Sequence, residues 1–193
     1  MKIGVLALHG DVIEHVRATT EAAKKLTQAV HIVEVRTKED LHSLDALIIP
    51  GGESTTLSKL CEREDMLGEI KKIKHIFGTC AGAIMLAKKV RRAIPGQKSL
   101  GLMDIEIDRN AYGRQMDSFE KDLQTKLGAI HAIFIRAPKI VRAGPGVTTL
   151  AKDSDNILAC EQKIKGRYYM AACFNPELTS TKFHEHFLKK IAV

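Results

Sequence analysis

Several features that mark membrane, secreted or multidomain proteins are missing from this chain of 193 residues. No apolar run approaches the roughly 20 residues that a membrane-spanning helix needs, and the opening MKIGVLALHGD reaches an acidic residue too early for a signal peptide. No internal repeat, low-complexity stretch or linker suggests a place to divide the chain. We therefore expect one cytoplasmic domain, residues 1–193, that has no membrane partner.

Cysteine clusters and basic runs are also missing. The four cysteines are widely spaced, with no CxxC pair and no density typical of a disulfide scaffold, so we expect reduced thiols: Cys61, Cys80, Cys160 and Cys173. The net charge of +7 comes from scattered Lys and Arg that form no run with interleaved aromatics. This favours a solvated basic surface over nucleic-acid binding, with an acidic protein partner as a further alternative.

The chain does contain the alternation of an α/β protein. Apolar residues make up 45% and charged residues 27%, as in a globular domain. Short apolar runs ending in Gly or Pro alternate with amphipathic segments, which predicts a doubly wound, mostly parallel sheet with helices on both faces. After Pro95 the pattern becomes β-rich. We expect strands at 3–8, 30–35, 46–49, 75–78, 103–108, 129–135, 157–161 and 168–174, and helices at 12–26, from 55, at 81–90 with a basic end, and at 181–191.

One segment has the spacing of a nucleophile elbow. Gly78-Thr79-Cys80-Ala81-Gly82 lies between a predicted strand and a predicted helix, and the glycines permit a strained turn that would expose the thiol near the positive end of the helix. The alternative is a buried cysteine that packs as a small apolar side chain. The paired glycines favour the nucleophile at Cys80, whereas the other three cysteines are predicted to be core or surface thiols.

A second glycine-rich loop ends another strand. Pro50-Gly51-Gly52-Glu53-Ser54-Thr55 exposes backbone N–H groups that could hold an oxyanion, although a plain tight turn also explains the glycines. Because the carboxyl ends of parallel strands face one crevice, both loops are expected to contribute to one site.

Five segments make the chain resemble a known family. PGGEST, GTCAG, RNAYGRQMDSFE, FIRAP and the closing F-x-PELT resemble the glutaminase subunits of pyridoxal 5′-phosphate synthase, over nearly the whole chain. GTCAG alone would indicate only the wider class I glutamine amidotransferases, whereas RNAYGRQ, SFE and FIRAP are specific to this subunit. The resemblance implies a flavodoxin-like glutaminase that needs no cofactor or metal and joins a synthase subunit in a large hetero-oligomer.

The resemblance also implies roles for individual residues. Cys80 would attack the glutamine amide to give a thioester and ammonia, with Glu177 as the acidic member of the triad. The N–H groups of Gly52 and Ala81 would hold the oxyanion. Glutamine contacts map to Gly52, Glu53, Ser54, Arg109, Ile135 and Arg136. An arginine suits the α-carboxylate of glutamine and Glu53 suits its ammonium group, whereas surface charge is the alternative for Arg109.

The sequence departs from the family at two positions. The family has His-Pro-Glu near its end, but this chain reads Asn175-Pro176-Glu177, and an asparagine cannot exchange a proton near neutral pH. The second departure is His9, where the family usually has a glutamine; His9 is one candidate substitute base. His184 and His186 are two apart on a helix, which argues against a shared catalytic or metal site.

Three functions remain open on the sequence. The first is a glutaminase whose turnover is impaired by Asn175, through substitution or divergence. The second is a subunit that binds glutamine and the synthase but performs little chemistry. The third is another α/β cysteine enzyme, such as a deglycase or general amidohydrolase, against which RNAYGRQ argues.

Overall fold

The computed structural model describes residues 1–111 and 118–192. Its parallel strands are β1 (Lys2–Leu6), β2 (His31–Val35), β3 (Ala46–Ile49), β4 (His75–Thr79) and β12 (Arg167–Ala172). They are arranged in the order β2-β1-β3-β4-β12. From β1 the chain first adds β2 on one side, and the later strands β3, β4 and β12 are added on the other side. This order is the doubly wound arrangement that the alternating pattern predicted, and it agrees with the flavodoxin-like fold that the resemblance implied.

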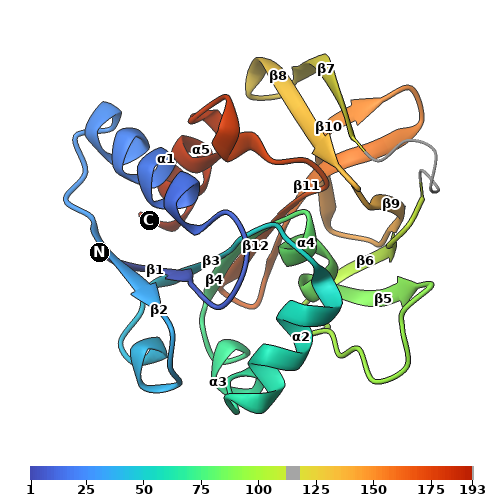
Figure 1. Ribbon diagram of the computed structural model, residues 1–193. Helices are drawn as coiled ribbons and strands as arrows, with labels where there is room; N and C mark the ends of the chain where they lie inside the picture. Colours follow the sequence, from blue (N-terminus) through green and yellow to red (C-terminus); the bar gives the residue numbers. More distant parts are fainter. Residues whose placement is uncertain (112–117, 193) are drawn as a thin grey trace.

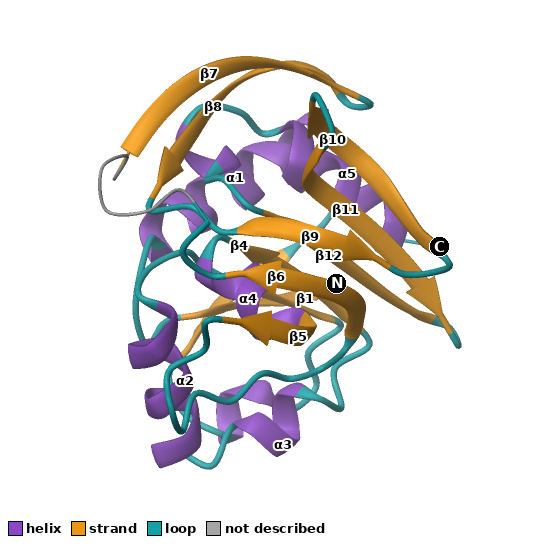
Figure 2. Cartoon of the chain, turned by 90° about the vertical axis from the view of Figure 1, so that its right-hand side faces the viewer, coloured by secondary structure: helices purple, strands orange, loops and turns teal. Residues whose placement is uncertain are grey.

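The β-rich part after Pro95 extends this sheet with antiparallel pairs. From β12 the sheet continues through β11 (Asn156–Ile164), β10 (Val147–Asp153), β7 (Ser118–Thr125) and β8 (Gly128–Ile135). A side branch consists of β5 (Ala87–Arg91), β6 (Met103–Asp108) and β9 (Lys139–Ala143). Figure 2 shows β7 and β8 as a long curved hairpin, far from α3. The sequence pattern did not predict strands β5, β7, β9 and β10 of this extension.

Helices cover both faces of the parallel strands. Helices α1 (Val12–Lys25) and α5 (Lys182–Ile191) lie side by side on one face, while α2 (Ser54–Arg63), α3 (Leu67–Ile70) and α4 (Ala81–Leu86) lie on the other (Figure 1). Strand β3 shows why two cores form: Leu47 and Ile49 join the core under α2 and α4, and Ile48 joins the core under α1 and α5. Alternate side chains of a strand point to opposite faces. Within the described ranges, no helix is long and apolar enough to cross a membrane.

The predicted helix over 81–90 is wrong in its second half. Helix α4 ends at Leu86, and Ala87 begins strand β5 with φ −64° and ψ 139°. The basic residues that the sequence placed at a helix end lie on β5 instead. There Lys89 and Arg91 both pair with Glu106 of β6, at 3.2 and 2.6 Å. Pairing with an acidic neighbouring strand therefore takes the place of the expected interaction with a helix dipole.

Candidate active site

Cys80 occupies a strained bend between β4 and α4. Its φ of 47° and ψ of −102° are disfavoured for a residue with a Cβ, a conformation that costs on the order of 1–3 kcal/mol. Its N–H donates to the carbonyl of Ala172 at 2.8 Å, which ties the bend to β12. The flanking glycines allow close packing, since a Cβ on Gly82 would lie 2.0 Å from the carbonyl oxygen of Ile49. The predicted strand-turn-helix therefore has a physical reason for the glycine at position 82.

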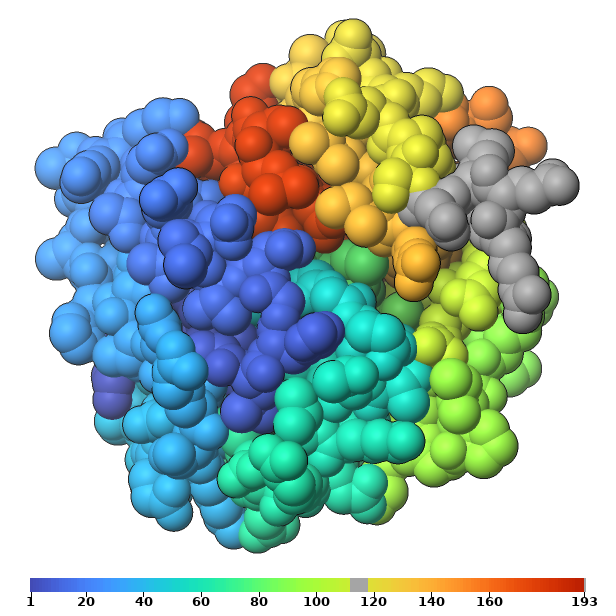
Figure 3. Space-filling view, viewed as in Figure 1, coloured from blue at the N-terminus to red at the C-terminus, as the bar shows by residue number. Residues whose placement is uncertain are grey.

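A pocket of about 520 Å³ opens over this bend. It lies where the loops after several parallel strands meet the end of β8, and Figure 3 shows a hollow where segments from distant parts of the chain converge, with green atoms at its floor. Its lining residues are Asp11, Gly52, Glu53, Ser54, Cys80, Ile84, Arg109, Asn110, Ile135, Arg136 and Asn175. Most site residues predicted from the sequence are thus brought together; Glu177 and Ala81 lie outside the lining.

The Cys80 thiol is held in its protonated form. Burial raises its pKa to about 12, the N–H groups of Gly52 and Ala81 act in the opposite direction, and the negative charges of Glu177 and Asp11 add to the rise. The Sγ–H group points toward the carbonyl of Ile135, with 3.8 Å between sulfur and oxygen. Both backbone N–H groups that the sequence assigned to an oxyanion hole therefore approach the sulfur, which is a neutral thiol at pH 7.

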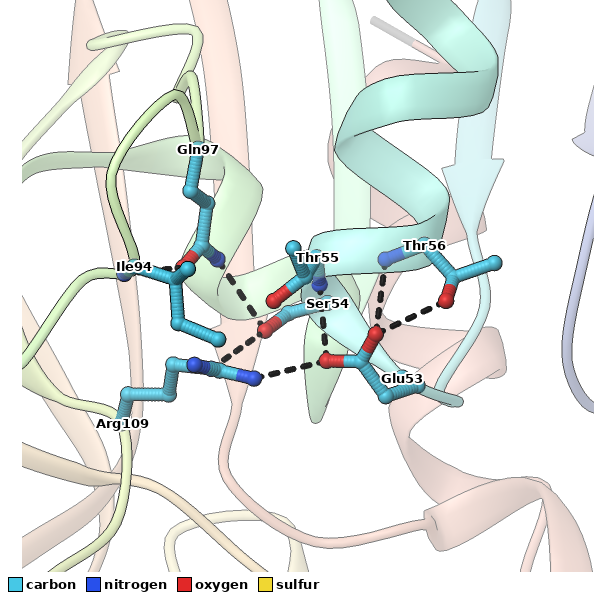
Figure 4. A network of polar contacts seen from close by, with 7 residues as sticks. All are labelled: Glu53, Ser54, Thr55, Thr56, Ile94, Gln97 and Arg109. Carbon is cyan, nitrogen blue, oxygen red and sulfur yellow. Dashed lines mark hydrogen bonds and ion pairs between the residues drawn. The ribbon is translucent and has the colours of Figure 1, made fainter.

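One wall of the pocket is a connected polar network, which Figure 4 shows from close by. The Glu53 carboxylate accepts hydrogen bonds from the N–H groups of Thr55 and Thr56 at 2.9 and 2.7 Å and so caps α2. Arg109 bonds to Glu53 at 2.7 Å and to the Ser54 hydroxyl at 2.9 Å. Partial burial raises the pKa of Glu53, but the hydrogen bonds from Thr55 and Thr56 outweigh it and hold that pKa at about 2.

The opposite wall has polar atoms that lack partners. A Cβ built on Gly51 would lie 2.8 Å from Oδ1 of Asn175, 3.2 Å from Oδ2 of Asp11 and 3.4 Å from Cβ of Cys80, so these three side chains converge around Gly51. The Asn175 N–H donates to the carbonyl of Ile133 at 3.0 Å. Its Oδ1 is buried and makes no hydrogen bond to any described residue. Asn175 thus lies beside Cys80 with an unused acceptor.

Glu177 faces away from this pocket toward a buried histidine pair. Its Oε1 lies 3.4 Å from Nε2 of His15, but that nitrogen makes its hydrogen bond to Thr79 Oγ1 at 3.0 Å. Among the described residues, neither carboxylate oxygen has an aligned hydrogen bond. His15 Nδ1 lies 3.0 Å from Nε2 of His184. Burial, followed by the charge of His15, lowers the pKa of His184 well below its usual value, so His184 is neutral.

Sequence reasoning missed His15, Asp11 and Gln97. Asp11 and His15 are four residues apart at the start of α1, and this spacing places both on one helical face. Burial and then the charge of Glu177 raise the pKa of Asp11. Gln97 follows β5 in a loop that carries no recognisable motif. The i,i+4 spacing was the available signal for the first two; Gln97 offered none.

The histidines considered as substitute bases have other surroundings. His9 packs against the glycine loop: a Cβ on Gly52 would lie 2.8 Å from His9 Cδ2, and His9 does not line the pocket. His184 and His186 face different partners, since His186 bonds to Glu161 at 2.5 Å. Among the described residues, no group of His, Cys, Asp and Glu could hold a metal ion.

Of the RNAYGRQMDSFE segment, residues 112–117 lie outside the described ranges.

Comparisons with known proteins agree on one family. The SNO glutamine amidotransferase family matches residues 5–193. The pyridoxal 5′-phosphate synthase subunit PdxT of Methanoregula boonei is 46% identical, over 100% of both chains, and PdxT of Pyrococcus horikoshii is 43% identical, over 99% of this chain and 100% of its own. A crystal structure of a glutamine amidotransferase superimposes with a TM-score of 0.84 at 44% identity, over 99% of both chains. The chain therefore belongs to the SNO glutamine amidotransferase family.

Proposed function

We propose that this chain is the glutaminase subunit of a pyridoxal 5′-phosphate synthase, with residues 1–193 acting as one glutaminase domain. It would hydrolyse L-glutamine to glutamate and ammonia and deliver the ammonia to a synthase subunit for vitamin B6 synthesis, within a large hetero-oligomer in the cytoplasm. The observation that best supports this proposal is the position of Cys80. It lies on a strained bend, faces two backbone N–H groups, and lines a pocket that contains Glu53, Ser54 and Arg109.

The residues support a two-step acyl transfer. Sγ of Cys80 would attack the amide carbon, and the N–H groups of Gly52 and Ala81 would stabilise the oxyanion. The carbon–nitrogen bond would then break, ammonia would leave with the thiol proton, and water would hydrolyse the thioester to glutamate. Arg109 and Ser54 suit the α-carboxylate, and Glu53 suits the ammonium group. Ile135 and Arg136 would complete the substrate contacts from the end of β8.

Asn175 supports a second candidate function, a subunit that binds glutamine and the synthase but turns over weakly or not at all. The attacking sulfur must lose a proton and the departing nitrogen must gain one, and an asparagine can do neither. The thiol pKa of about 12 makes the lack of a base more severe. Glu177, turned toward His15, has no imidazole at position 175 to orient.

Ammonia release and glutamine binding separate the two candidates. The full chain, alone and mixed with a synthase subunit, would be assayed for ammonia from glutamine, with Cys80→Ser as the control. Release that requires Cys80 supports the glutaminase. Tight glutamine binding with no release supports the binding subunit, and failure to bind glutamine in either preparation would refute both.

A further inference from the structure

The Ser54 hydroxyl accepts two hydrogen bonds from side chains of two other segments. Arg109 Nε donates to it at 2.9 Å, and Gln97 Nε2 donates to it at 3.1 Å (Figure 4). A serine hydroxyl has two acceptor positions and one hydrogen to donate. Both acceptor positions are therefore filled by N–H groups, and the hydrogen must be donated to a third partner.

The orientation of the Gln97 amide is set by its other end. Its Oε1 accepts a hydrogen bond from the N–H of Ile94 at 3.3 Å, so the NH₂ group must be the end that faces Ser54. The opposite orientation would place two donors against each other at Ile94 and leave Ser54 Oγ facing an oxygen. Gln97 thus acts on Ser54 as a donor only.

The backbone around Gln97 is fixed to the helix that carries Ser54. A turn closes with a hydrogen bond from Gln97 N–H to the carbonyl of Ile94 at 2.9 Å. The next residue, Lys98, exchanges two bonds with the Ser58 hydroxyl of α2, at 2.9 and 3.0 Å. Ser54 and Ser58 are one turn apart on α2, so this loop is held against the same helix face at both positions.

The hydrogen of the Ser54 hydroxyl can be donated only toward the Cys80 pocket. Ser54 is 4% exposed, lines the Cys80 pocket, and has no acceptor for its hydrogen among the described residues. We propose that Gln97 is a positioning residue that makes Ser54 an obligate hydrogen-bond donor toward the pocket, and so selects a ligand that presents a carboxylate oxygen there. The inference rests on the proposed function, because it takes the α-carboxylate of glutamine as that acceptor.

Gln97→Glu reverses the polarity of this contact without changing its shape. A carboxylate can still accept from the N–H of Ile94, but it offers Ser54 an acceptor in place of a donor. The Ser54 hydrogen would then turn toward residue 97 and away from the ligand. Glutamine binding, measured by calorimetry on the full chain, should weaken roughly 10- to 100-fold, the loss expected for one hydrogen bond to a charged group plus repulsion.

The α-amide of L-glutamine separates positioning from a general disturbance. Its carboxamide can donate as well as accept, so a Ser54 oxygen that has lost the Gln97 donor can accept a bond from it. The ratio of glutamine affinity to α-amide affinity should fall about tenfold or more in Gln97→Glu. Equal weakening of both ligands, or no weakening, would overturn the inference.

Two further variants keep the test decisive. Gln97→Met retains the volume but makes no hydrogen bond, and it should lower the same ratio about threefold; an unchanged ratio would overturn the inference even if Gln97→Glu does not fold. Gln124→Glu adds the same charge at an exposed position on β7 and should leave both affinities unchanged. If the unmodified chain binds no glutamine, the proposed function fails; if it binds glutamine and the ratio stays constant, only the role of Gln97 fails.

Discussion

The two walls of the Cys80 pocket differ in how completely their polar groups are paired. Glu53, Ser54 and Arg109 form a network in which each side chain has partners at 2.7–3.1 Å. On the other wall, Asn175 carries a buried oxygen without a hydrogen bond to a described residue, and so does Glu177, which lies outside the lining. Buried polar groups are normally satisfied, so the exceptions need an explanation. The wall that we propose to hold the ligand has its side chains paired, whereas the wall that we propose to lack a base has a buried oxygen without a partner.

Introducing a base at position 175 should have the largest effect on the wall that contains Asn175. Asn175→His places an imidazole where Oδ1 now has no partner, beside Cys80. We expect glutamate release to rise about 10²- to 10⁴-fold, the usual contribution of a positioned general base. Glutamine binding should change little, because the paired wall is untouched. The Cys80→Ser/Asn175→His double variant is the control, and unaltered turnover in Asn175→His alone would indicate divergence beyond this single residue.

Cys80 should behave as an unactivated thiol in the chain as it stands. With its pKa near 12, the thiolate fraction rises about tenfold for each pH unit well below that value. Alkylation of Cys80 by iodoacetamide, followed by peptide mass spectrometry, should therefore increase about 10³-fold between pH 7 and pH 10. A rate that levels off below pH 9 would contradict a thiol held neutral by burial.

The buried His15–Glu177 contact should matter more for stability than the paired wall. His15→Gln removes a buried imidazole that lies 3.4 Å from Glu177 and bonds to Thr79 and His184, and leaving such buried polar groups without partners costs about 1–3 kcal/mol of unfolding free energy. Arg109→Gln, beside the half-exposed Glu53, should cost about 1 kcal/mol or less. Urea unfolding at pH 7 measures both, and a His15→Gln variant as stable as the parent chain would contradict a stabilising role for the His15 contacts.

The smallest effect is expected from acid titration of Glu53. Its pKa is lowered from 4.5 to about 2 in the folded chain, so its contribution is present above about pH 4.5 and is lost as the pH falls toward 2. Because the side chain is 45% exposed, solvent screening limits this contribution to below about 1 kcal/mol. Urea midpoints between pH 3 and pH 6 should therefore fall less steeply with acid in Glu53→Gln.

The sequence predicted most of the parallel half and of the pocket. Strands such as 46–49 are continuous apolar runs that stop at Pro or Gly, and both glycine loops end at one crevice because parallel strands share their direction. Helix α4 was predicted too long, because Lys88 to Arg92 look like a helix end until β6 supplies acidic partners. Strands β7, β9 and β10 are half exposed and lack a continuous apolar run, and β9 in addition depends on pairing with β6, which is distant in the sequence.

The site shows the same division. Cys80, Glu53, Ser54 and Arg109 lie in motifs, and the structure brings them together in one pocket. His15 and Gln97 act through contacts across 162 and 43 residues of sequence, to Glu177 and Ser54; the i,i+4 spacing to Asp11 was the one local signal for His15, and no local pattern indicates Gln97. The turn of Glu177 toward His15 could not be foreseen either, because it depends on how α1 packs against the last loop.

The contact between the Cys80 sulfur and the Ile135 carbonyl has a consequence for oxidative damage. Peroxide attacks the thiolate and not the thiol, so a sulfur that keeps its hydrogen directed at a carbonyl oxygen presents little reactive anion. The Cys80 sulfur is thereby protected from conversion to sulfenic acid for as long as it keeps its proton.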